Sequence, residues 1–220
     1  DRVTLMTNVG NVMMLANKNT LAAWNDYNLE NFDLGIGCVS DQGYVLAAGV
    51  LFFVHYTGIY ATTGRRPKPM SSKIEQYITG ATKDGLENAA MGIKGFSIFT
   101  AIGDVTLYNP DGSVLKIVTN VLLEYDLRQE NWYVHTGIDA DQFVKYPATL
   151  DPQTLEFSNP TTGHIYTFLT GMADIGGHTD LSISDEIPFN ATLPPITMHK
   201  EFDKICYPKE IIVEVERGSG

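Results

Sequence analysis

The sequence lacks a long apolar run. The longest, residues 45–54, has about ten residues, whereas a helix needs roughly 20 to cross the hydrocarbon core of a bilayer. A run of this length is typical of a strand that is buried on both faces. The sequence therefore predicts no membrane-spanning helix and no membrane partner.

Positive charge is also scarce. Lys and Arg total 15 against 26 Asp and Glu, which gives a formal net charge of -11 at pH 7. Residues 65–68 form the one basic cluster in the sequence. Because a net negative charge repels phosphate backbones, we expect no nucleic-acid partner.

Cysteine is the third scarcity. Cys38 and Cys206 are the only two in the chain, which leaves open one disulfide in an oxidising compartment or two buried thiols in a reducing one. A glycosylation sequon begins at Asn190, and with the cysteines it favours a secreted or extracytoplasmic location. Residues 218–220 match a tag remnant, so we expect a single domain over residues 1–217.

What the sequence has in abundance is strand-forming composition. Hydrophobic residues make up 44% of the 220 residues and aromatic residues 10%, which is enough to build a core. Runs of β-branched and aromatic residues, separated by Asp, Gly, Pro and Asn, predict strands. The expected strands are residues 32–39, 44–54, 96–102, 105–108, 114–124, 132–135, 143–146, 164–170, 181–184 and 211–215.

Two short helices are expected among these strands. The first covers residues 20–29, where Asn19 can cap a partly apolar face. The second covers residues 72–79, where Ser72 and Glu75 match a capping box. Few helices among many strands predict an α+β fold that is predominantly antiparallel β.

Residues 164–178 bring two imidazoles to one predicted hairpin. His164 and Tyr166 are two positions apart and therefore lie on the same face of the predicted strand. Gly176-Gly177 lets the backbone turn back and bring His178 beside them. Such a pair holds a metal or a substrate, or consists of two hydrogen-bonded structural histidines. Glu124 ends an apolar strand, where partial desolvation suits a carboxylate to acid–base catalysis.

Two further side chains are candidates for lining a pocket. His55 follows the longest apolar run and can approach the same site as the two imidazoles. Tyr125 is one of several tyrosines that can orient an oxygen-bearing ligand.

Several motifs occur in an order that resembles the alpha-acetolactate decarboxylase family. They are residues 5–8, 21–27, 32–37 and 44–53, then residues 68–77 and 111–116, and finally the segment from His164 to His178 with Asp180-Leu181. Members of that family hold zinc with three histidines, beside acidic groups and an arginine that polarise a 2-hydroxy-3-oxo acid during decarboxylation. The resemblance implies an acetolactate decarboxylase-like fold.

The resemblance also implies a ligand set. His164 and His178 take the first and last metal positions, while the middle position falls on Tyr166 or, if the register shifts by one residue, on Thr167. Asn120 stands near the place of the arginine. These departures favour a metal-free or differently ligated site, so the expected cofactor is zinc or none.

These features predict a divergent acetolactate decarboxylase-like enzyme, a lyase or an isomerase/cyclase. It would act by acid–base chemistry or oxygen polarisation on a small to medium oxygenated carbon skeleton. Two alternatives stay open: a non-catalytic secreted binding protein for an apolar oxygenated ligand, and an assembly subunit that pairs with copies of itself. The candidate residues are His178, His164, Tyr166 and Glu124 for catalysis, His55, Tyr125, Thr167 and Asn120 for substrate binding, and His164 and His178 for a metal.

Overall fold

A computed structural model describes residues 2–25, 27–32, 35–145 and 155–168, and the backbone of residues 173–175 and 184–186. The chain forms two compact units, residues 1–169 and residues 170–220. In the second unit, β16 (Ala173–Ile175) pairs antiparallel with β17 (Ser184–Glu186). The single domain expected over residues 1–217 stays a prediction.

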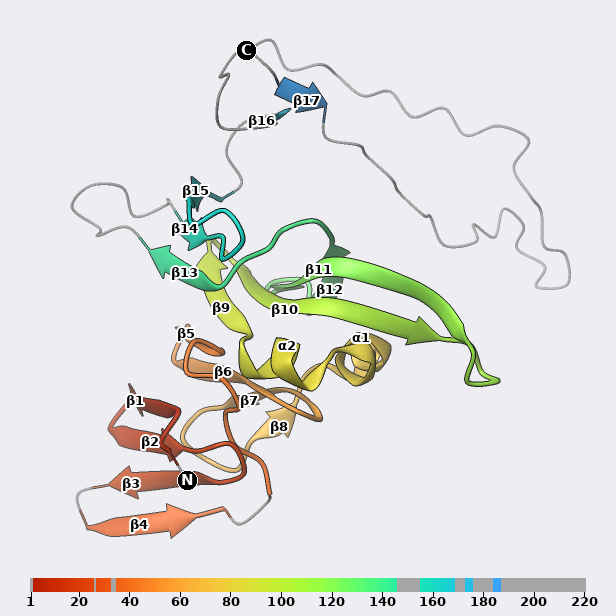
Figure 1. Ribbon diagram of the computed structural model, residues 1–220. Helices are drawn as coiled ribbons and strands as arrows, with labels where there is room; N and C mark the ends of the chain where they lie inside the picture. The colour runs from red at the N-terminus through yellow and green to blue at the C-terminus, as the bar shows by residue number, and fades with distance from the viewer. Residues whose placement is uncertain are drawn as a thin grey trace, which may run out of the picture. The chain divides into compact units, whose positions relative to one another are not determined.

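Four sheets follow one another along the first unit, and in each sheet the hydrogen-bonded neighbours are consecutive strands (Figure 1). Sheet 1 contains β1 (Leu5–Val9), β2 (Val12–Ala16), β3 (Leu21–Asn25) and β4 (Asn28–Asn31). Sheet 2 contains β5 (Tyr44–Ala47), β6 (Val50–His55), β7 (Gly58–Thr62) and β8 (Lys68–Pro69). Sheet 3 contains β9 (Ala90–Lys94), β10 (Ser97–Tyr108), β11 (Val114–Asp126) and β12 (Asn131–His135). Sheet 4 contains β13 (Gln142–Lys145), β14 (Leu155–Ser158) and β15 (Ile165–Thr167).

All the strand pairs within these sheets are antiparallel, with few helices between them. The predominantly antiparallel β class is therefore confirmed. The helical segments join sheet 2 to sheet 3, and they are η1 (Ser72–Ile74), α1 (Glu75–Gly80) and α2 (Lys83–Glu87).

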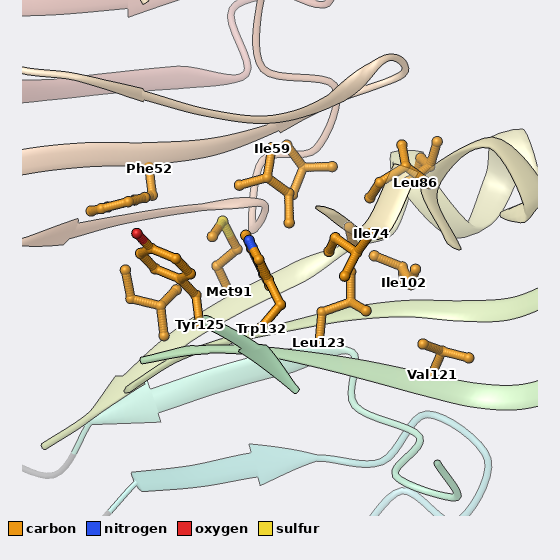
Figure 2. Packing of buried hydrophobic residues seen from close by; sticks show 14 of the residues in the cluster. Phe52, Ile59, Ile74, Leu86, Met91, Ile102, Val121, Leu123, Tyr125 and Trp132 are labelled. Atoms are coloured by element: carbon orange, nitrogen blue, oxygen red, sulfur yellow. The ribbon is translucent and has the colours of Figure 1, made fainter. Parts of the chain in front are cut away.

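Three apolar layers hold the four sheets together, one between each sheet and the next. The layer between sheets 1 and 2 contains Leu5, Met14, Leu21, Leu51 and Phe53 among its buried side chains. The layer between sheets 2 and 3 is the largest, and it also takes in the helices; Figure 2 shows Phe52, Ile59, Ile74, Leu86, Leu123 and Trp132 within it. The layer between sheets 3 and 4 contains Phe99, Ala101, Leu122, Leu155 and Phe168.

Strand β6 shows why a middle sheet needs an almost continuous apolar sequence. Leu51 and Phe53 belong to the layer shared with sheet 1, whereas Phe52 and Val54 belong to the layer shared with sheet 3. Successive side chains of a strand point to opposite faces, so a sheet covered on both faces buries every position. Sheet 3 follows the same rule, with Ile98 and Phe99 in different layers.

The two helices lie directly on β10, and glycine makes this approach possible. A side-chain carbon added at Gly80 would overlap the carbonyl oxygen of Thr106, and one added at Gly85 would lie 2.5 Å from the carbonyl oxygen of Ile102. The second helix is capped by Thr82, whose hydroxyl accepts a hydrogen bond from the N–H of Gly85 at 3.0 Å. The helix surfaces therefore meet the sheet without intervening side chains at these two points.

The helix predicted for residues 20–29 is wrong, because this segment forms the β3–β4 hairpin. Leu21 and Ala23 are buried while Trp24 is exposed, which is a period of two and not of 3.6. The side chain of Asn25 accepts hydrogen bonds from the N–H groups of Tyr27 and Asn28, at 3.2 and 2.9 Å. This turn, which sequence analysis did not anticipate, lets the two strands pair.

The apolar run of residues 45–54 is also not one strand. It folds into β5 and β6 around Ala48 and Gly49, whose φ angles of 50° and 78° are both positive. Positive φ at both central residues is the requirement of a type I′ hairpin turn. The expected burial on both faces is confirmed only for β6.

Other predictions were confirmed in part. The helix expected at residues 72–79 is present as η1 and α1, but no side chain caps either start, so the capping box is wrong. The strand expected at residues 132–135 is β12. No strand forms in the described part of residues 32–39, where Val39 instead donates a single backbone hydrogen bond to Val54.

Candidate functional site

The structure describes three of the four predicted catalytic residues, and these three lie in two separate places. His178 is outside the described residues, as are Gly176 and Gly177. Tyr166 belongs to β15 of sheet 4, His164 directly precedes that strand, and Glu124 belongs to β11 of sheet 3. The convergence of His164 with His178 therefore stays a prediction.

In sheet 4, His164 and Tyr166 lie next to each other as predicted. Their ring centroids are 6.4 Å apart, and Tyr166 also stacks on Phe157 at 5.4 Å. Thr162 shares a hydrogen bond of 3.4 Å with the Tyr166 hydroxyl. His164 and Thr167 are exposed, so this part of the sheet presents polar groups to solvent.

In sheet 3, Glu124 forms a pair that sequence analysis missed. Its carboxylate lies 2.7 Å from Nε2 of His135 on the neighbouring strand β12. The Glu124 side chain is 19% exposed and that of His135 is 43% exposed, so the pair is open to a small molecule. A carboxylate bonded to an imidazole can orient the ring and exchange a proton with it, which makes this pair the best acid–base candidate in the described part of the chain.

The two predicted pocket residues His55 and Tyr125 lie in apolar surroundings. His55 is buried, its Nδ1 lies 3.1 Å from the carbonyl oxygen of Gly37, and burial lowers its pKa. Tyr125 is buried against Phe52 and Trp132, on the opposite face of β11 from Glu124, and burial raises its pKa. Substrate binding by these two residues stays a prediction.

Asn120 occupies a strained position beside a small cavity. Its φ is 49°, and its N–H donates a hydrogen bond to Asp104 at 2.9 Å. The cavity has a volume of about 90 Å³ and includes Asn88, Asn120 and Asp139 in its lining. This volume holds a few water molecules but not an oxygenated carbon skeleton.

A charged cluster around Glu87 is the strongest polar feature that sequence analysis missed. Lys18 contacts the Glu87 carboxylate at 2.8 Å, Lys83 lies 3.7 Å away, and the Tyr56 hydroxyl donates a hydrogen bond to it. The hydrogen bonds from Lys18 and Tyr56 lower the pKa of Glu87 to about 2. Burial and the bond to Glu87 raise the pKa of Tyr56 to about 12. The i,i+4 spacing of Lys83 and Glu87 was the only signal available in the sequence.

This cluster borders an open cavity of about 500 Å³. Its lining includes Arg2 and Asp41, which pair with each other at 2.8 Å, and also Lys18 and Glu87. The charged groups of the cluster pair with one another. Through the contacts of Lys18 and Tyr56 with Glu87, the cluster links the segment after β2, the β6–β7 turn and α2.

Substituting Glu87 with glutamine is expected to reduce the loss of stability in acid. The folded-state pKa of Glu87 lies below its ordinary value of 4.5, so its contribution is present above that value and disappears as the pH falls towards about 2. Chemical unfolding followed between pH 5 and pH 2 should show a shallower decline for Glu87→Gln than for the wild type. Glu75→Gln, at an exposed position, should retain the wild-type decline; equal slopes for all three proteins would contradict the prediction.

No three His, Cys, Asp or Glu side chains are placed to hold a metal ion in the described ranges, and the zinc site with His178 stays a prediction. Cys38 is buried, which raises the pKa of its thiol to about 12 and keeps it protonated at neutral pH. Its pairing with Cys206 stays open because Cys206 is not among the described residues.

The described helices are all too short or too polar to span a bilayer. In comparisons with known proteins, no family model matches the chain and no curated protein matches its sequence.

Proposed function

We propose that the chain is a non-catalytic scaffold whose stacked sheets take part in a larger assembly. The observation that carries this proposal is the serial order of the sheets, each packed on the next through its own apolar layer. Antiparallel sheets of four consecutive strands, repeated along a chain, are the blades of β-propellers. Sheets 1, 2 and 3 each contain four consecutive strands and sheet 4 contains three. The sheets are therefore best explained as blade-like units whose purpose is to build a rigid frame.

A long hairpin supports the assembly role. Strand β9 pairs with β10 only up to Ala101, and β12 pairs with β11 only from Leu122 onwards, so the distal part of the hairpin has two strands (Figure 1). This distal part exposes Tyr108, Val114, Leu115 and Ile117, each more than half accessible. Clustered exposed apolar side chains mark contact surfaces in soluble proteins.

Velocity sedimentation of the protein in an extract of its source tests this proposal. The chain, of 24.3 kDa, is expected in a particle several times larger, and Leu115→Glu is expected to release it. Thr119→Glu introduces the same charge at an exposed position of the same strand and should leave the particle intact. Sedimentation of the wild type as a free chain would contradict the scaffold function.

The Glu124–His135 pair favours a second candidate, a divergent acetolactate decarboxylase-like lyase or isomerase. In this proposal the pair transfers a proton of a small oxygenated substrate, His164 and His178 polarise its oxygen or hold zinc, and Tyr166 orients it. The fold would then be a distant acetolactate decarboxylase-like one, with the enzyme secreted.

Assays of decarboxylation and isomerisation of 2-hydroxy-3-oxo acids test this candidate. Glu124→Gln is expected to lower kcat by roughly 10²- to 10⁴-fold, the usual contribution of a general acid or base. Glu130→Gln, at an exposed turn position, serves as the control. The enzyme proposal fails if neither Glu124→Gln nor His178→Ala changes the rate.

A further inference from the structure

The outer face of sheet 1 has the composition of a buried surface. The face that packs on sheet 2 carries Leu5, Met14 and Leu21, so the alternate residues of each strand point the other way. The strand register aligns these alternate residues in two rows across the sheet. One row is Met6, Leu15, Ala22 and Asn31, and the other is Asn8, Met13, Trp24 and Leu29.

Six of these eight side chains are apolar and none is charged. Met6 is 63% exposed, Trp24 44% and Leu29 60%, although an antiparallel sheet with one open face normally turns polar residues to solvent. In a chain with a net charge of -11, an uncharged sheet face is unexpected unless something covers it. Sheets 2 and 3, which are covered on both sides, show the same apolar pattern.

We infer that the outer face of sheet 1 binds the same face of a second copy of this chain. A two-fold contact brings each surface against itself, and an uncharged apolar face is complementary to itself. Two copies that each carry a net charge of -11 meet there without placing like charges in contact. Trp and Met side chains are enriched in such contacts, since they bury large areas and adapt in shape.

The outer face of sheet 4 fits this role less well. Phe143 and Phe157 point into the layer shared with sheet 3, so the opposite face carries Val144, Glu156 and Ile165 with polar neighbours. A carboxylate at the centre of a contact between identical chains would be desolvated at a cost. Face-to-face packing of apolar sheets, as found within the chain, is therefore expected at the outer face of sheet 1 and not at the outer face of sheet 4.

The size of the face sets the expected affinity. Three strands of five residues and one of four, about 4.8 Å apart, give a face of roughly 19 by 17 Å. This is smaller than a standard interface of about 800 Å² per partner. The dimer is thus expected to be weak, to form only as the protein is concentrated and to dissociate on dilution.

Light scattering and sedimentation equilibrium of the purified full chain test the inference. The wild type should approach twice its mass of 24.3 kDa as its concentration rises, and Trp24→Glu should weaken association about 30-fold or more, as for an interface hot spot. Ile165→Glu introduces the same charge on the outer face of sheet 4 and should leave the dimer unchanged. A dimer that survives Trp24→Glu, or that is lost in Ile165→Glu, overturns the inference.

Hydroxyl-radical footprinting of the wild type supplies a test that needs no substitution. Met6, Met13 and Trp24 should be oxidised quickly in dilute protein and become protected as the dimer forms. Protection that is already complete in a monomer would mean that the same chain covers the face, and would overturn the inference. The inference rests on the proposed scaffold function only because both use sheet faces as contact surfaces. The dimer is tested with purified protein and the larger particle with an extract, so that either can fail without the other.

Discussion

Phe53→Ala is expected to lower the free energy of unfolding by about 3–5 kcal/mol, the usual cost of truncating a fully buried phenylalanine. Phe53 has no exposed surface and stacks on Tyr60 at 5.9 Å, in the layer between sheets 1 and 2. The substitution removes its apolar contacts and leaves a cavity that the flanking sheets cannot close without moving. A loss of this size is a large part of the 5–15 kcal/mol that stabilises a typical domain.

Urea unfolding measured by circular dichroism checks the prediction. The matched control is Phe96→Ala, because Phe96 is 58% exposed and its ring lies against the Arg128 guanidinium, at 4.8 Å. Its cost should stay near 1 kcal/mol or below. If both variants lost equal stability, the two-sided packing of β6 would not be what stabilises the fold.

Gly80→Ala is expected to destabilise the protein by about 1–3 kcal/mol or more, because the added methyl group overlaps the carbonyl oxygen of Thr106 in β10. Backbone cannot move aside as a side chain can, so α1 would have to lift from the sheet. The expected change in stability is therefore opposite in sign to the usual effect of a Gly→Ala substitution in a helix. At an open helical position, Gly→Ala stabilises by roughly 1 kcal/mol through helix propensity.

Thermal unfolding distinguishes these two signs. Thr79→Ala changes the preceding residue of α1, which is exposed, and should stay within about 0.5 kcal/mol of the wild type. An increase in stability for Gly80→Ala would show that the helix does not lie as close to β10 as the structure places it.

Several strands and one turn could be predicted because their signals are local. The residues Asn109-Pro-Asp-Gly112 are typical of a turn, and the β10–β11 hairpin forms around them. The predicted helix over residues 20–29 failed because its apolar spacing fits two periods in so short a segment. Packing of Leu21 and Ala23 against sheet 2 selects the period of two.

The candidate groups were harder to predict because they depend on register and on distant contacts. Glu124 and His135 are eleven positions apart in the sequence. The register of β11 and β12 places His135 opposite Leu122, two positions from Glu124 and therefore on the same face of the sheet. Tyr56 and Glu87 are 31 positions apart and come from a turn and a helix. No spacing rule within one strand or helix identifies either pair.

The sequence by itself determined the predominantly β character of the chain and the places of several strands and turns. These follow from backbone preferences and turn residues that act over a few positions. Only the tertiary structure decided that the sheets stack in chain order, that sheets 2 and 3 each contribute side chains to two apolar layers, and that sheet 1 keeps an uncharged apolar face exposed. Apolar attraction has no direction, so an apolar residue in the sequence does not specify which sheet will cover it.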